Sequence, residues 1–150
     1  MRKLYSKLFA LMLVISGFLV PMQLQADVHK RVVLQAFWWN YWNENYPNSY
    51  ANYLTELAPR LKEYGINAVW IPPSYKNTGT NSVGYSPFDH YDLGDKYQKG
   101  STTTRFGTKD EFLRMVAVMH ANGIEVIQDI VLNHVDGAGG TDGAGGEDPS

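Results

Sequence analysis

The sequence of 150 residues contains no cysteine, and this absence excludes several classes of protein at once. Without thiols the chain cannot be a disulfide scaffold, a thiolate zinc protein or an enzyme with a catalytic cysteine. It also cannot be a bacterial lipoprotein, whose lipid is attached to an N-terminal cysteine. Charged residues make up only 19% of the chain, with 13 Lys and Arg against 15 Asp and Glu. Because there is no basic surplus, nucleic-acid binding is not indicated.

The first apolar run is too short to anchor the chain in a membrane. It extends from Leu8 to Val20, which is 13 residues, whereas a membrane-spanning helix needs about 20. Three basic residues precede the run, and Ala26 offers a small residue for cleavage. Residues 1–26 are therefore predicted to be a secretory signal peptide. We expect a secreted protein, extracellular or periplasmic, with no membrane attachment after cleavage, and an intact Met1 on the exported protein would contradict this.

Removal of the signal peptide would make the chain more acidic. All 15 acids lie after position 26, and three of the 13 bases lie before it, so ten bases remain and the formal charge becomes −5. An acidic exported protein is a poor partner for polyanions or anionic membranes. A neutral substrate is more consistent with this charge.

The mature chain alternates predicted strands and helices. β-branched and aromatic residues predict a strand over 31–39, and apolar runs predict strands over 66–71 and 124–135. Apolar side chains at steps of three and four predict helices over 50–64 and 108–123. Because each helix returns the chain to the same edge of the sheet, the strands are expected to be parallel, with helices covering both faces. The fold class is α/β.

Several local signals refine this picture. Pro59 predicts a kink in the first helix or a late start, and Thr108 with Glu111 forms a capping-box pattern at the start of the second. The polar connection over 74–107 is too long for a simple link, and such loops are usually functional. The glycine-rich residues 136–150 are predicted to form a surface loop.

The third predicted strand carries three polar residues among apolar ones, Asp129, Asn133 and His134. On an extended strand, Asp129 and Asn133 would point to the same face. One interpretation is structural, with Asp129 paired to an arginine and Asn133 capping a loop. The other is functional, because ligands bind where parallel strands end. Glycine-rich nucleotide-binding motifs do not follow any predicted strand.

The segment 129–134, DIVLNH, resembles the first conserved segment of the α-amylase family, glycoside hydrolase family 13, which lies at the end of the third barrel strand. Other segments of the chain are similar to the same family in the same order: LQAFWW at 34–39, VWIPP at 69–73, VGYSPFDHYDLG at 83–94, YQKG at 97–100 and RFGT at 105–108. The resemblance runs from about Val32 to Val135. It implies an incomplete (β/α)8 TIM barrel, with the first three strands, their helices and the start of domain B.

The domain organisation implied by the resemblance has three parts. Residues 1–26 are the signal peptide, and residues 27–135 are the N-terminal part of the catalytic (β/α)8 barrel. Residues 136–150 are the glycine-rich start of a domain B-type loop, truncated at the end of the chain.

The resemblance also assigns roles to four residues. Tyr85 is expected to stack against the sugar bound just before the scissile bond, and His134 to hydrogen-bond the same sugar. Asp129 is expected to support the active-site network without taking part in the chemistry. Asn133 is expected to be a ligand of a structural Ca²⁺ ion between the barrel and domain B. Because Ca²⁺ requires six to eight oxygens, the other ligands are expected beyond residue 150.

Two further groups of residues are left with open roles. Aromatic residues after the first strand could extend a sugar-stacking platform or could serve ordinary packing: Trp38, Trp39 and Trp42. Polar residues of the long connection are expected to organise that loop: Asp89, His90 and Asp92.

Retaining glycosidases need two carboxylates, about 5–5.5 Å apart. The resemblance places them after the fourth and fifth strands, with another aspartate after the seventh, so no catalytic residue is assigned in this chain and all are expected beyond Ser150. The expected function is that of an N-terminal fragment, inactive alone, of a retaining, endo-acting α-amylase. Its partner would be an α-glucan polysaccharide such as starch or glycogen, and the full-length enzyme would be monomeric.

Two alternatives to this function remain. The parent could be another family member, either maltogenic or transglycosylating. Alternatively, the chain could be a naturally short, non-catalytic glucan-binding protein, which would bind starch without turning it over.

Overall fold

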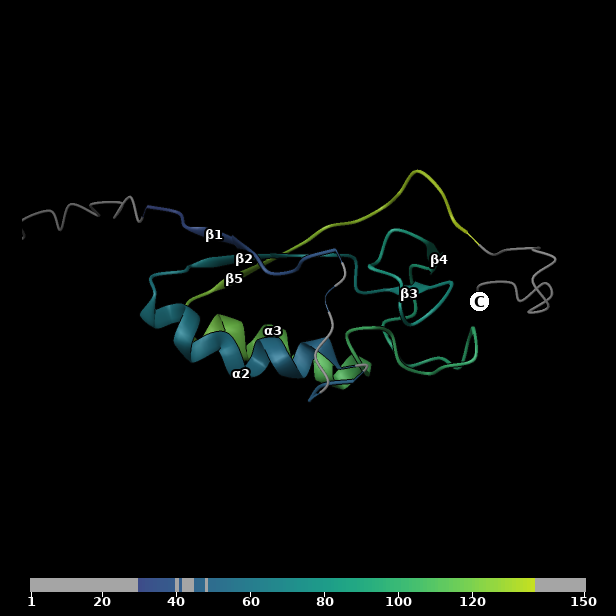
Figure 1. Ribbon diagram of the computed structural model, residues 1–150, viewed down its shortest axis with the longest axis horizontal. Coiled ribbons are helices and arrows are strands. Elements are labelled where there is room, and N and C mark those ends of the chain that lie inside the picture. The colour runs from purple at the N-terminus through teal and green to yellow at the C-terminus, as the bar shows by residue number, and fades with distance from the viewer. Residues whose placement is uncertain (1–29, 40, 42–44, 48, 137–150) are drawn as a thin grey trace, which may run out of the picture. The chain divides into compact units, whose positions relative to one another are not determined.

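The structure is a computed structural model that describes residues 30–39, 41, 45–47 and 49–136 (Figure 1). The predicted signal peptide, Trp42 and all but the first residue of the glycine-rich segment 136–150 lie outside these residues. Within the described part of the chain, no helix is both long enough and apolar enough to cross a membrane.

Three short strands form a parallel sheet, as predicted. They are β1 (Val33–Gln35), β2 (Ala68–Ile71) and β5 (Glu125–Gln128), in the order β1-β2-β5. All three are shorter than the predicted ranges, and the first and third differ most. After β5, one further bond joins the Asp129 N–H to the Ile71 carbonyl at 2.9 Å, and the chain then leaves the sheet.

Two helices connect these strands and lie together on one face of the sheet (Figure 1). They are α2 (Tyr50–Glu63) and α3 (Lys109–Ala121), and they pack against each other. The prediction that helices cover both faces is therefore wrong for the described residues. A parallel sheet with its strands in chain order and its helices on one face is the arrangement found within a (β/α) barrel, whereas doubly wound sheets have helices on both faces.

The helix ends follow local sequence signals. The capping box is confirmed, because the Thr108 hydroxyl accepts the Glu111 N–H at 3.3 Å and the Glu111 carboxylate accepts the Thr108 N–H at 2.8 Å. Burial acts to raise the pKa of Glu111, but hydrogen bonds, with that from the Thr108 N–H foremost, outweigh it and lower the pKa. Helix α2 begins at Tyr50 and continues through Pro59, so the late start is wrong.

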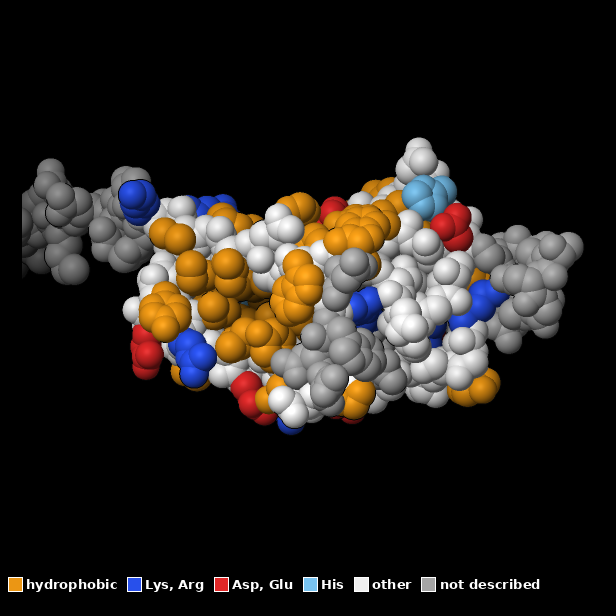
Figure 2. Space-filling model, in the orientation of Figure 1, with side chains coloured by type: hydrophobic (Ala, Val, Ile, Leu, Met, Phe, Trp, Pro, Cys, Tyr) orange, Lys and Arg blue, Asp and Glu red, His pale blue; other side chains and the backbone are white. Residues whose placement is uncertain are grey.

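The hydrophobic core lies between the sheet and the two helices. Figure 2 shows apolar side chains gathered over the sheet and the two helices, whereas few are visible around β3 and β4. The core combines aliphatic side chains with an aromatic cluster after β1 and around α2 and α3. Its buried members include Phe37, Tyr41, Tyr50, Leu54, Val69, Ile71, Phe106, Phe112, Met115, Met119 and Ile124.

The long connection 74–107 contains a small antiparallel sheet of β3 (Lys76–Asn77) and β4 (Pro87–Asp89). It is organised by a buried ion pair, in which Lys76 Nζ lies 3.2 Å from Asp92 Oδ2. The same ammonium lies within hydrogen-bonding distance of four backbone carbonyl oxygens, those of Lys96, Ser101, Thr102 and Thr103, at 2.7–3.3 Å, so its three N–H groups are shared among them. We call Asp92 Oδ2 and these four carbonyl oxygens the lysine cage.

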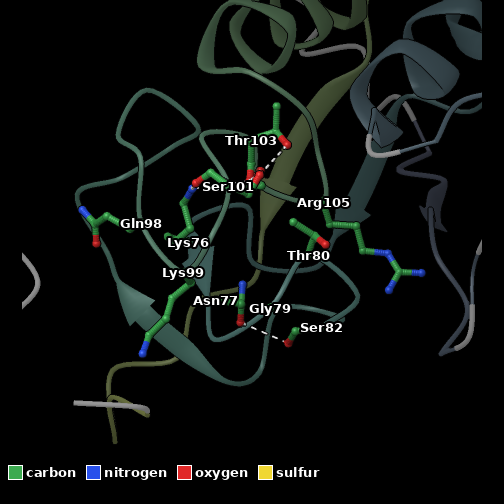
Figure 3. Close-up of a pocket in the computed structure, with 11 residues that line it drawn as sticks. Lys76, Asn77, Gly79, Thr80, Ser82, Gln98, Lys99, Ser101, Thr103 and Arg105 are labelled. Carbon is green, nitrogen blue, oxygen red and sulfur yellow. Dashed lines mark hydrogen bonds between the residues drawn. The ribbon is translucent and has the colours of Figure 1, made fainter. Parts of the chain in front are cut away.

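A small polar cavity lies beside the lysine cage and is lined by residues of β3 and of the turn around Ser101 (Figure 3). Its volume of about 10 Å³ has room for one water at most. This cavity is therefore part of the loop's packing and is not a substrate site.

Two carboxylates hold the turns of the same connection, as expected. Asp92 Oδ1 accepts the Gly94 N–H at 2.8 Å, and Asp89 accepts the side chains of Lys96 and Gln98 at 3.1 and 2.9 Å. Burial acts to raise the pKa of Asp89, but these hydrogen bonds and the Lys96 charge outweigh it, so the pKa is lowered. Asp89 and Asp92 are thus confirmed as loop organisers.

Candidate functional site

Three of the predicted site residues meet just beyond the carboxyl end of β5. Asp129 directly follows that strand, and Tyr85 lies in the segment between β3 and β4. The Tyr85 hydroxyl donates to Asp129 Oδ2 at 2.9 Å, and His134 Nε2 lies 3.1 Å from the Tyr85 carbonyl oxygen. Because a carbonyl oxygen can only accept, His134 carries a proton on Nε2 in this arrangement.

The hydroxyl of Tyr85 is held in its protonated form. Burial, the hydrogen bond to Asp129 and the negative charge of that carboxylate raise the pKa of Tyr85 to about 12. At neutral pH the hydroxyl is therefore a donor to Asp129. This bond fixes the orientation of the tyrosine ring, whose faces are suited to stacking against the C–H groups of a sugar.

An open cleft of about 470 Å³ lies beside Tyr85, which is within the range of small-molecule binding sites. Trp39 lines it and stacks parallel to the Tyr85 ring, with 5.8 Å between ring centroids and 3° between planes. Trp39 is 65% exposed. The other residues that line the cleft are mainly polar: Asn81, Ser82, Val83, Ser86 and Arg105.

The two tryptophans that the structure describes in this region therefore differ in environment. Trp39 lines the cleft, whereas Trp38 packs edge-on against the ring of Tyr41 with 6.0 Å between centroids. Trp42 lies outside the described residues.

Two expectations that rested on an extended third strand need correction, the shared face of Asp129 with Asn133 and the pairing of Asp129 with an arginine. Asp129 and Asn133 lie past the end of β5, so strand periodicity does not place them on one face. Asp129 is half-buried and is partnered by Tyr85 in place of an arginine. The strand does not extend through this segment because the backbone N–H and carbonyl of Val131 hydrogen-bond to side chains of the 74–107 connection and not to a neighbouring strand.

Asn133 is exposed, and its Nδ2 lies 3.4 Å from His134 Nδ1. An amide oxygen is a suitable ligand for Ca²⁺, but the ion requires six to eight oxygens. Within the part of the chain that the structure describes, no group of three His, Cys, Asp or Glu side chains is placed to hold a metal ion.

Three residues that contact this region were not assigned a role in it from the sequence. Tyr75 and His90 both bind the backbone of Val131. Arg105 lies with its guanidinium 3.8 Å from the centroid of the Tyr41 ring and donates to the Asn81 carbonyl. Tyr75 closely follows the proline pair after β2 and Arg105 begins the RFGT segment, but no local pattern indicates which distant backbone groups they contact.

Comparison with known proteins identifies the family. The model of the α-amylase catalytic domain matches residues 53–138. The α-amylase of Bacillus licheniformis is 37% identical over 142 residues, which is 94% of this chain and 27% of that protein. The glucan 1,4-α-maltohexaosidase of Bacillus sp. (strain 707) is 38% identical over 91% of this chain and 26% of its own length. The chain thus spans about a quarter of these relatives.

Solved structures support the same fold. An alternansucrase in complex with isomaltotriose superposes with a TM-score of 0.59 at 22% identity, over 73% of this chain and 10% of that one. The trehalose-6-phosphate hydrolase of Bacillus licheniformis gives a TM-score of 0.50 at 26% identity, over 71% of this chain and 18% of that one. Together with the family match, they show that the strands and helices are those of a (β/α)8 barrel fold. The chain belongs to the α-amylase family, glycoside hydrolase family 13.

Proposed function

We propose that this chain is the N-terminal part of an exported α-amylase that cleaves internal α-1,4-glucosidic bonds of starch or glycogen with retention. The observation that carries the proposal is the meeting of Tyr85, Asp129 and His134 beside an open cleft. An aromatic face and a hydrogen-bonding imidazole are suited to a neutral sugar. The chain's own contribution would be to bind one sugar of the glucan, while the carboxylates that break the bond would come from later strands.

The edges of the sheet support this assignment to a larger barrel. An apolar groove of about 130 Å³ lies between β1 and α2, lined by residues such as Leu34, Phe37 and Leu57. After β5, Ile130 and Leu132 are 54% and 78% exposed. Apolar surface of this kind at both edges of a parallel sheet is suited to burial by further strand–helix units.

Substitution of Tyr85 tests the proposed role in sugar binding. In titrations of the 150-residue chain with maltoheptaose, followed by tryptophan fluorescence, Tyr85→Ala should weaken binding at least about tenfold, because stacking and orientation are both lost. Tyr85→Phe keeps the ring but loses the bond to Asp129, and should weaken binding about two- to fivefold. Tyr64, which is 74% exposed at the end of α2, provides the control Tyr64→Ala.

The proposal would be contradicted by equal affinities of the parent chain and Tyr85→Ala. The same chain should release no reducing sugar from starch, since it carries no assigned catalytic carboxylate. Release of reducing sugar by the purified chain would contradict the prediction that the chain is inactive by itself.

We further propose that the amide oxygen of Asn133 is one ligand of a structural Ca²⁺ ion, and that residues 1–26 direct export. An enzyme that continues past Ser150 should lose thermal stability on removal of Ca²⁺ with a chelator. Asn133→Ala should then raise the Ca²⁺ concentration needed to restore the melting temperature by about tenfold, because one coordinating oxygen is lost. An unchanged Ca²⁺ requirement in Asn133→Ala would exclude Asn133 as a ligand.

A further inference from the structure

The segment that carries Asp129 and His134 lies outside the sheet, yet both backbone groups of Val131 within it are bound by side chains. The Val131 N–H donates to the Tyr75 hydroxyl oxygen at 2.9 Å. His90 Nε2 lies 2.6 Å from the Val131 carbonyl oxygen, so this nitrogen is the donor. These contacts take the place of the strand hydrogen bonds that the backbone would otherwise make.

The two rings also support each other. The Tyr75 and His90 rings have centroids 4.6 Å apart and planes inclined by 53°. Tyr75 is 2% exposed and His90 is half-buried. Both side chains start from backbone that is already fixed, because Tyr75 precedes β3 and His90 follows β4 in the same small sheet. We call the two side chains with the Val131 backbone the Val131 clamp.

The clamp acts on the middle of a segment whose two ends are tied separately. At one end the Asp129 N–H donates to the Ile71 carbonyl at 2.9 Å, and at the other the Asp136 N–H donates to the Pro87 carbonyl at 2.6 Å. Leu132 is 78% exposed, and Asn133 is exposed as well. Side-chain packing therefore contributes little to holding the middle, which is fixed by the two hydrogen bonds to the Val131 backbone and by that of His134 Nε2 to the Tyr85 carbonyl.

We propose that Tyr75 and His90 are positioning residues, which hold the Val131 peptide so that Asp129 stays on the Tyr85 hydroxyl and His134 beside the Tyr85 carbonyl. The consequence for sugar affinity rests on the proposed function, whereas the clamp itself is a geometric claim. Neither residue is a catalytic residue, since both act through the backbone of the segment.

Nuclear magnetic resonance of the ¹⁵N-labelled 150-residue chain tests the clamp without any ligand. His90 should be in the tautomer with the proton on Nε2. In Tyr75→Phe, the exchange rate of the Val131 amide should rise about five- to tenfold as its acceptor is lost. The amides of β2 should exchange as in the parent chain. The clamp would be overturned if His90 showed both tautomers in the parent chain and the Val131 amide exchanged at the same rate in Tyr75→Phe as in the parent chain.

Maltoheptaose titration then tests positioning. His90→Leu removes the donor and should weaken binding about three- to tenfold, whereas His90→Gln keeps an N–H donor and should restore most of the affinity. His120, exposed in the last turn of α3, provides the control His120→Leu. Because His90 is only half-buried, its variants keep the test available if Tyr75→Phe does not fold.

The outcomes separate the two proposals. If His90→Leu speeds exchange of the Val131 amide but binds maltoheptaose with the affinity of the parent chain, the clamp does not position the sugar site and the inference is wrong. A different result is that His90 has its proton on Nε2 and Tyr75→Phe speeds exchange of the Val131 amide, but the parent chain binds no maltoheptaose. The clamp is then supported and the glucan function is rejected.

Discussion

Replacing Lys76 by methionine should lower the free energy of unfolding by about 3–5 kcal/mol, the usual cost of removing one partner from a buried ion pair. The Lys76 side chain is 3% exposed and that of Asp92 is fully buried. Asp92 Oδ2 has no hydrogen bond in the structure and relies on the ammonium 3.2 Å away. Methionine would leave this carboxylate and four backbone carbonyls facing an apolar side chain.

Urea unfolding followed by circular dichroism measures this loss. Lys62→Met removes an exposed lysine near the end of α2 and should change stability by no more than about 0.5 kcal/mol. The double variant Lys76→Met with Asp92→Asn should be more stable than the sum of its single changes predicts, because the uncompensated charge is gone. A loss below about 1 kcal/mol in Lys76→Met would mean that the lysine cage does not hold the connection together.

Substitution of Gly94 by alanine should destabilise the chain by about 3 kcal/mol or more. Gly94 has φ of +103°, which side-chain-bearing residues rarely adopt. A Cβ atom at this position would also overlap the Gly107 carbonyl oxygen and lie 3.1 Å from the Lys109 backbone nitrogen. Because the obstructing atoms are backbone, the loop segment that meets the start of α3 would have to move as a whole.

Two other glycines separate the conformational cost from the steric one. Gly100 has φ of +75°, but a Cβ atom there would meet no other atom, so Gly100→Ala should cost about 1–2 kcal/mol. Gly79 has neither constraint, and Gly79→Ala should change stability by less than about 0.5 kcal/mol. Equal unfolding free energies for the Gly94 and Gly100 variants would contradict the steric contribution of the Gly107 carbonyl.

Both predictions concern the connection 74–107, which supplies Tyr75, Tyr85 and His90 to the site. Loss of the lysine cage or of the Gly94 turn would therefore also loosen the Tyr85–Asp129 hydrogen bond.

Lowering the pH should also destabilise the connection 74–107, through protonation of Asp89. Its pKa is lowered in the folded chain, so its stabilising contribution is present above the pKa of the unfolded state and is lost as the pH falls through the lower folded value.

Local features of the fold were predicted from the sequence because they depend on neighbouring residues. The apolar steps of α2 and the Thr108 capping box each involve residues three or four positions apart, and both are found in the structure. Parallel pairing also follows from chain order, since a helix between strands returns the chain in the same direction. Strand length does not follow in this way, because β5 ends at Gln128 and the backbone of Val131, three residues later, binds side chains of the 74–107 connection.

The sequence by itself determined the family of this protein, the order of its strands and helices, and which residue types stand at the strand ends. Only the tertiary structure decided that Tyr85 is the partner of Asp129, 44 positions away, and that Lys76 is enclosed by oxygens of a distant turn. The physical reason is that hydrogen bonds between distant residues depend on the path of the loops. Periodicity and propensity describe neighbours along the chain, and loop paths are set by the packing of the whole fold.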